Sequence, residues 1–164
     1  MKIFLAMLFS ALFFIGCSDD KAVENAQAKL VVGKSLEGLK LNDQHKKPQT
    51  LPQDTKYVIF SFSKPVGHMC NAFLEAHPAD FLPKHHTVYV ADVSPAPGII
   101  KNMFILPDLE KLPFPILLIN DDVLSAEYSK GINKEKIVVV ELDNLKITNI
   151  KYLNDEKELE ALFK

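Results

Sequence analysis

Short apolar runs, rich in aromatic and β-branched residues, recur along the chain between clusters of turn residues. Runs of this kind are typical of buried strands. The three central runs lie at 57–62, 87–93 and 114–119. Two further pairs of runs flank short polar turns and therefore predict hairpins. These pairs are 36–41 with 47–51, and 136–142 with 146–153.

Segments with helical spacing separate the predicted strands. Residues 69–81 place Cys70, Phe73, Leu74 and His77 at such spacing, and 99–106 gathers Ile99, Ile100, Met103 and Phe104 on one apolar face. Shorter helices are predicted at 123–130, stopped by Gly131, and at 155–163. This order predicts one α/β domain with a mixed central sheet, helices on both faces and an N-terminal β-hairpin.

The N-terminus has a different pattern. Lys2 precedes an apolar run, 3–15, that only Ser10 interrupts and that is too short to span a bilayer alone. The run ends in Phe14-Ile15-Gly16-Cys17, which resembles the lipobox of bacterial lipoproteins. A plain signal peptide and an uncleaved N-terminal anchor are the alternatives.

The lipobox resemblance implies a removed signal peptide (1–16), a Cys17 carrying fatty acyl chains such as palmitate, and a polar tether (17–31) before the domain at 32–164. It places the protein in the bacterial cell envelope, facing the periplasm. Ser18 follows the cysteine where inner-membrane lipoproteins usually carry Asp, and this favours the outer membrane over the inner.

The amino-acid composition excludes some classes of function for this protein. The 164 residues are 48% apolar and 24% charged, with a formal charge of −2, so we expect a globular domain and no nucleic-acid partner. All 19 cationic side chains are Lys, which excludes chemistry that needs a guanidinium. With Cys17 lipidated, Cys70 is the one remaining cysteine; it is either buried or reactive.

The order of elements carries a family resemblance. Residues 32–164 resemble the thioredoxin-fold branch that includes TlpA/ResA-type thiol–disulfide proteins and peroxiredoxins. The resemblance rests on Val32-Gly33-Lys34 with the hairpin after it, on the strand 56–62, on Phe114-Pro115-Ile116 and on the closing hairpin at 138–147. It implies a thioredoxin-like three-layer sandwich. A shorter alignment that reads Pro115 as the family's cis-proline would leave one hairpin unused.

The family's active-site motif is incomplete. The resemblance implies a Cys-x-x-Cys in the first turn after the first core strand, and its positions fall on Gly67-His68-Met69-Cys70. Gly67 therefore occupies the position of the family's first cysteine. The family has its cis-proline at a position that falls near Glu135, and no proline stands there. We expect a binding or scaffold module for an envelope protein rather than an enzyme. The expected contact residues are Val66, Gly67, His68, Met69 and Glu135.

Two alternatives use the same segment. Cys70, activated by His68 and a helix N-terminus, would make a monothiol redox or disulfide-handling protein. Soft ligands at His68, Met69 and Cys70 would make a copper or zinc carrier. Further candidate ligands are His77, His85, His86 and Met103. No complete ligand set is visible, so we expect neither a metal nor a cofactor.

Overall fold

The structure is a computed structural model that describes residues 22–164. Its elements follow the predicted alternation of strands and helices. The strands are β1 (Lys40–Asp43), β2 (Pro48–Thr50), β3 (Tyr57–Ser61), β4 (Thr87–Asp92), β5 (Leu117–Ile119), β6 (Ile137–Asp143) and β7 (Lys146–Leu153). The helices are α2 (Lys64–Glu75), α3 (Phe81–Lys84), α4 (Gly98–Ile100), the π-helical η1 (Lys101–Ile105), α5 (Leu106–Leu109), α6 (Asp122–Ser129) and α7 (Glu156–Ala161).

One mixed sheet contains all seven of these strands, in the order β2-β1-β5-β4-β3-β6-β7. β3, β4 and β5 are parallel, whereas the two hairpins β1-β2 and β6-β7 add antiparallel strands on either side. Both predicted hairpins are confirmed. Because two further strands, β6 and β7, follow β5 in the same sheet, the longer of the two alignments is the correct one.

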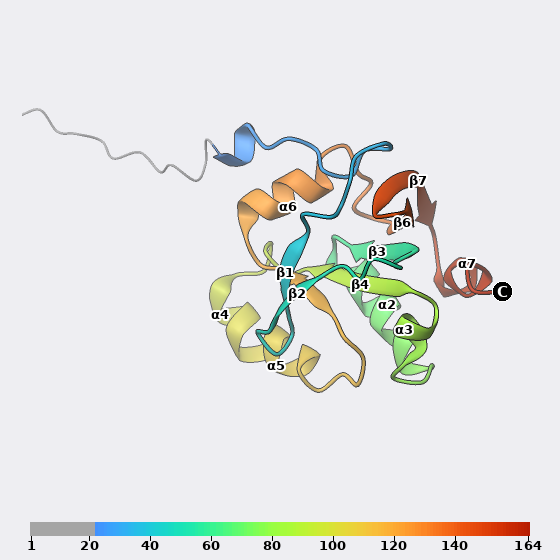
Figure 1. Ribbon diagram of the computed structural model, residues 1–164. Coiled ribbons are helices and arrows are strands. Elements are labelled where there is room, and N and C mark those ends of the chain that lie inside the picture. Colours follow the sequence, from blue (N-terminus) through green and yellow to red (C-terminus); the bar gives the residue numbers. More distant parts are fainter. Residues whose placement is uncertain (1–21) are drawn as a thin grey trace, which may run out of the picture.

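Helices cover both faces of the sheet (Figure 1). Alternate residues of each strand point to opposite faces, so Phe60 belongs to one apolar cluster and its neighbour Ile59 to the other. α6 and the segment around Leu30 close the first face through Tyr128 and Leu30. α2, α3, α5 and α7 close the second. The predicted three-layer arrangement is therefore confirmed.

Helix α2 begins earlier than the sequence pattern predicted. It spans Lys64–Glu75, whereas the prediction was 69–81. Ser63 has an extended backbone and forms the N-cap, and Pro65 stands in the first turn. Proline is favourable there because its fixed φ is helical and its missing N–H has no partner to lose. The helix ends before Pro78, and the chain resumes as the short α3.

Residues 98–109 form a second helical stretch with a π-helical centre. Pro107 has no N–H to donate to the preceding turn, and this accounts for the irregular geometry just before it. The apolar face expected in this stretch exists, but it is exposed. Ile99 is 73% exposed, Met103 65% and Phe104 57%.

The boundary predicted at residue 32 is wrong, because the domain includes the segment before it. Ala26 and Leu30 are buried, and Leu30 belongs to the first apolar cluster. The Lys29 amide donates to the carbonyl of Glu127, and the Lys130 ammonium donates to the carbonyl of Ala26. These contacts fasten the segment to α6. The predicted signal peptide and Cys17 lie outside the described residues.

Within 22–164, no helix has the length and apolar character needed to cross a membrane.

We predict that Leu30→Ala destabilises the domain by about 2–5 kcal/mol, because it removes a buried side chain from the core. Val32→Ala is the matched control, since Val32 is 59% exposed and its truncation should change stability by less than about 0.5 kcal/mol. Urea unfolding followed by circular dichroism measures both. Equal, small effects would mean that the segment before residue 32 does not belong to the folded domain.

Candidate functional site

Three loops meet at one edge of the sheet. β3 and β4 are parallel, so their carboxyl ends lie together, and β6 runs antiparallel to β3 and starts at the same edge. Phe60 pairs with Val138, so the chain leaving β3 passes the chain entering β6. We call residues 62–68, 93–97 and 131–136 the loop edge. Four of the predicted contact residues, Val66, Gly67, His68 and Glu135, belong to these segments, and Met69 directly follows the first of them.

The first turn of α2 forms the centre of the loop edge. Lys64 and Pro65 are exposed, whereas Val66 points into the core and is 2% exposed. The Gly67 amide donates to the Ser63 carbonyl at 2.9 Å. The Ser63 hydroxyl is buried and has no hydrogen-bond partner among the described residues. This turn contains no cysteine. The predicted placement of the motif on Gly67-His68-Met69-Cys70 is wrong, because α2 begins three residues before Gly67.

Cys70 lies deeper than the sequence analysis placed it. It is the seventh residue of α2, not a first-turn residue, because the helix begins at Lys64. Its side chain is 1% exposed and packs in the second apolar cluster. Burial raises the pKa of the Cys70 thiol to about 12, and a hydrogen bond with Tyr89 opposes the shift only in part. The monothiol alternative expected the helix N-terminus to lower this pKa, and that expectation is wrong; of the two positions predicted for Cys70, buried or reactive, the structure shows the buried one.

Cys70 has polar neighbours inside the core. Tyr89 is fully buried on β4, and its hydroxyl lies 2.9 Å from the Ser61 hydroxyl. Burial also raises the pKa of Tyr89 well above its usual value. At neutral pH, all three groups are therefore uncharged. Such an arrangement satisfies buried polar atoms and offers no thiolate.

The predicted contact residues do not share one surface. His68 and Glu135 are exposed, and Met69 is half-buried against the second apolar cluster. Val66 is buried, so its predicted contact with a partner is wrong: at the third position of α2 it faces the sheet. Gly67 leaves no special space, because an added Cβ would meet the Ser61 hydroxyl at an ordinary 3.7 Å.

Lys64 and Pro65 are exposed residues of this edge that the sequence analysis left out. A Ser followed two residues later by Pro, directly after a strand, is a recognisable helix start. This signal would have placed the start of the helix at Lys64. The first turn would then have been assigned to Lys64-Pro65-Val66-Gly67, and Cys70 to the buried side.

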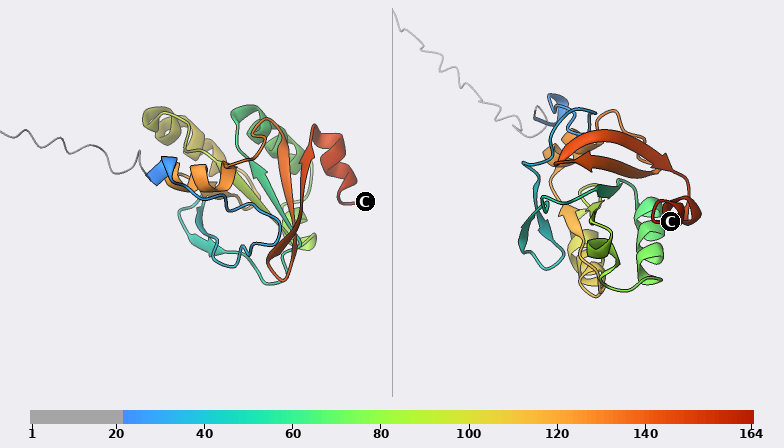
Figure 2. Two further views of the ribbon diagram at one scale, coloured as in Figure 1. Left: turned by 90° about the horizontal axis from the view of Figure 1, so that it is seen from above. Right: turned by 45° about the vertical axis from the view of Figure 1, so that its right-hand side comes forward.

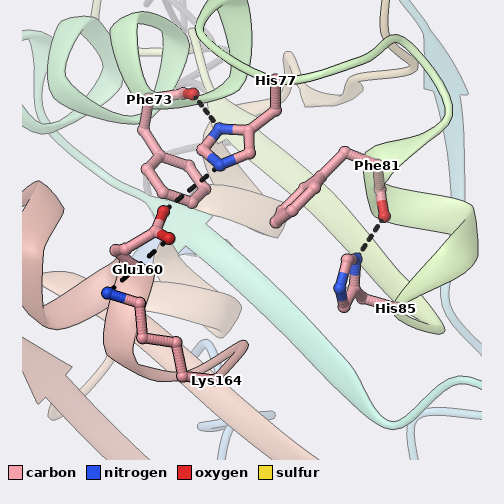
Figure 3. Close-up of polar contacts among 6 residues, drawn as sticks. All are labelled: Phe73, His77, Phe81, His85, Glu160 and Lys164. Atoms are coloured by element: carbon pink, nitrogen blue, oxygen red, sulfur yellow. Dashed lines mark hydrogen bonds and ion pairs between the residues drawn. The ribbon is translucent and has the colours of Figure 1, made fainter.

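Two of the candidate metal-binding histidines belong to an aromatic stack at the other end of α2 (Figure 3). His77 and His85 donate from Nδ1 to the carbonyls of Phe73 and Phe81, at 2.7 and 2.8 Å. The Phe81 ring lies between them, with centroid distances of 4.2 and 4.3 Å. His77 Nε2 lies 3.2 Å from the Glu160 carboxylate, which fastens α7 to this end of α2. Their role is therefore in packing.

The remaining candidate ligands do not converge. His68 is exposed and Cys70 is buried, so neighbours in sequence face different surroundings. His86 pairs with Asp54 at 2.7 Å, at the edge where β4 begins. Among the described residues, no three His, Cys, Asp or Glu side chains are grouped so as to hold a metal ion.

A cleft of about 220 Å³ opens at that same edge, opposite the loop edge. Asp43, Asp54, His86 and Pro115 are among its lining residues. None of the predicted contact residues borders it. The cleft and the loop edge are therefore separate features of the surface.

Comparison with known proteins supports the fold. No family model matches the chain, and no curated protein matches it either. Among solved structures, the thioredoxin domain of a thiol-disulfide oxidoreductase from Bacteroides vulgatus is 15% identical with a TM-score of 0.52, over 82% of this chain and 99% of that one. StoA from Bacillus subtilis is 16% identical with a TM-score of 0.50, over 77% and 96%. The chain therefore has a thioredoxin-like fold.

We predict that Cys70 is almost unreactive in the folded protein. A pKa of about 12 lowers its thiolate fraction about a thousandfold below that of an exposed thiol at the same pH. The measurement is the rate of labelling by a thiol reagent at pH 8 in the Cys17→Ala variant, with the urea-unfolded protein as control. Similar rates in the folded and unfolded protein would contradict the buried position of Cys70.

Proposed function

We propose that this thioredoxin-like protein is a lipid-anchored binding module of the bacterial cell envelope, which holds another envelope protein at its loop edge without exchanging disulfides. The observation that carries the proposal is the first turn of α2. It lies where the resembling families keep their redox dithiol, and it reads Lys64-Pro65-Val66-Gly67. The chain's second cysteine, Cys70, is buried behind it.

The electron balance of disulfide exchange supports binding over catalysis. A thiol that opens a disulfide forms a mixed disulfide, and a second thiol must then release the product. Cys70 is 1% exposed and protonated at neutral pH, so it is poorly suited even to the first step. The monothiol alternative is therefore not favoured. The copper or zinc alternative has no converging ligands among residues 22–164.

The exposed side chains of the loop edge suit a peptide partner. Lys64 and His68 project from α2, and Glu135 lies on the loop before β6, where the Asn133 side chain accepts from the Glu135 amide. The cationic Lys64 on α2 and the anionic Glu135 on the loop before β6 can bind a polypeptide that carries both charges. Loops supported by a rigid sheet are common binding surfaces.

The lipobox-like sequence supports the anchor. Cys17 after Phe14-Ile15-Gly16 is the residue that we expect to be acylated, and several acyl chains on one residue give stable membrane attachment. The domain would then face the periplasm. Ser18 after the cysteine favours the outer membrane.

We predict that Cys17→Ala abolishes incorporation of labelled palmitate when the full chain is expressed in a bacterium. The reason is that the thiol is the acceptor of the first acyl chain. Ser18→Ala is the control and should be labelled like the wild type. Equal labelling of wild type and Cys17→Ala would show that the lipoprotein assignment is wrong.

We predict that a photo-crosslinking amino acid at position 68 captures an envelope protein in cells, whereas one at position 84 does not. Both positions are exposed, but Lys84 ends α3 at the opposite edge of the sheet. Adding Lys64→Glu with Glu135→Lys should weaken the adduct, because it reverses both charges of the loop edge. Adding Cys70→Ala should leave the adduct intact.

Identical adducts from positions 68 and 84, or none from 68, would contradict the binding surface. Loss of the adduct in Cys70→Ala, with the fold intact by circular dichroism, would favour the monothiol alternative. The crosslink does not depend on the palmitate result, so the anchor and the binding surface are tested separately.

A further inference from the structure

The helical stretch 98–109 is apolar on two opposite sides. Its inner side packs Ile105, Leu106 and Leu109 against the second apolar cluster. Its outer side presents Ile99, Ile100, Met103 and Phe104, which are 73%, 45%, 65% and 57% exposed. We call these four residues the exposed apolar face. An apolar helix face is normally buried against a neighbour, so this outer face lacks a covering.

The exposed apolar face stands out from the rest of the described surface. Outside it, the large apolar side chains exposed among residues 22–164 are Val23, Val31, Val32 and Tyr152. The first three lie in the N-terminal segment, and Val23 belongs to the helical turn at 22–24 that begins the described chain. Exposed apolar surface is thus concentrated in two segments.

The helical turn at 22–24 and α4 lie toward the same end of the molecule, on opposite faces of the sheet. In Figure 1, the blue start of the described chain lies at the upper left and α4 lies at the left below it, and both lie toward the left in the view from above in Figure 2. β7 and α7 lie on the other side in both views. Residue 22, from which the chain continues toward Cys17, therefore lies toward the end of the molecule that carries α4.

The length of that continuation limits how far the domain can stand from a membrane. Five peptide links join Cys17 to residue 22, and they span at most about 18 Å when fully extended. The segment after residue 25 is fastened to α6 and adds no slack. A lipidated Cys17 therefore keeps this end of the domain close to the bilayer surface.

We propose that the exposed apolar face inserts into the bilayer beside the lipid anchor, so that the domain is held in one orientation on the membrane. The proposal rests on the lipid anchor proposed above. Residues 98–112 carry two lysines and two carboxylates, Lys101, Lys111, Asp108 and Glu110, so the stretch is neutral overall. Insertion should therefore come from apolar burial and need no anionic lipid.

The chain has no Trp, so one introduced Trp reports on its own surroundings. The acylated full-length protein is purified as Phe104→Trp and reconstituted in phosphatidylcholine vesicles, with and without brominated acyl chains. Tyr152→Trp is the matched control, because Tyr152 is 42% exposed on β7, on the opposite side. Both variants must unfold at the wild-type temperature.

We expect the Phe104→Trp emission to shift to shorter wavelength on vesicles and to lose most of its intensity with brominated lipid. The Tyr152→Trp emission should change in neither respect. The same result should hold at high salt, because no net charge is involved.

Other results overturn the proposal in distinguishable ways. If the vesicles carry the protein on flotation but Phe104→Trp is not quenched, the anchor stands and the docking is wrong. If both tryptophans are quenched alike, the domain has no preferred orientation. A blue shift without quenching means that a second copy covers the face. If the protein does not float with the vesicles, the anchor itself fails and the docking fails with it.

Discussion

The packing of α2 on the centre of the sheet determines the rest of this structure. β3 is bonded on one side to β4 and on the other to β6, and its inward residues are almost fully buried. α2 covers this centre with Val66, Cys70, Phe73 and Leu74. Truncating a large side chain in such a layer costs about 2–5 kcal/mol, so the rotation of the helix on the sheet is strongly fixed.

That rotation explains why the thiol of Cys70 is buried and uncharged at neutral pH. The helix starts at Lys64, because the backbone of the preceding Ser63 is extended and Pro65 has a fixed φ that suits the first turn. Counting from that start, Val66, Cys70 and Phe73 fall on the buried side, and Lys64 and His68 on the exposed side. The surroundings of Cys70 then follow from its position: the interior disfavours a charged thiolate, and Tyr89 contributes only a partly compensating hydrogen bond.

The sequence predicted the order of strands well and the helix starts poorly. Apolar β-branched runs such as 57–62 have few alternative interpretations, and turn residues fix the hairpins on either side. The helix predicted at 69–81 starts too late, because Pro65 belongs to the first turn and proline in a first turn is a start signal. Leu30 falls in the predicted tether because the residues before it are polar. Only its contact with the core shows that it belongs to the domain. The packing of a single apolar residue against distant parts of the chain produces no periodic pattern in the local sequence from which its burial could be predicted.

The loop edge and the exposed apolar face are joined by the chain itself. Residues 93–97 belong to the loop edge, and Gly98 begins the helical stretch that carries Ile99 and Phe104. A bilayer that covers this face would hold the loop edge beside the lipid surface. The reach of the proposed partner would then be limited as well, because the partner would have to approach Lys64 and His68 within the layer next to the membrane. This geometry favours a partner that is itself attached to the same membrane, since shared attachment raises the effective concentration of the two proteins.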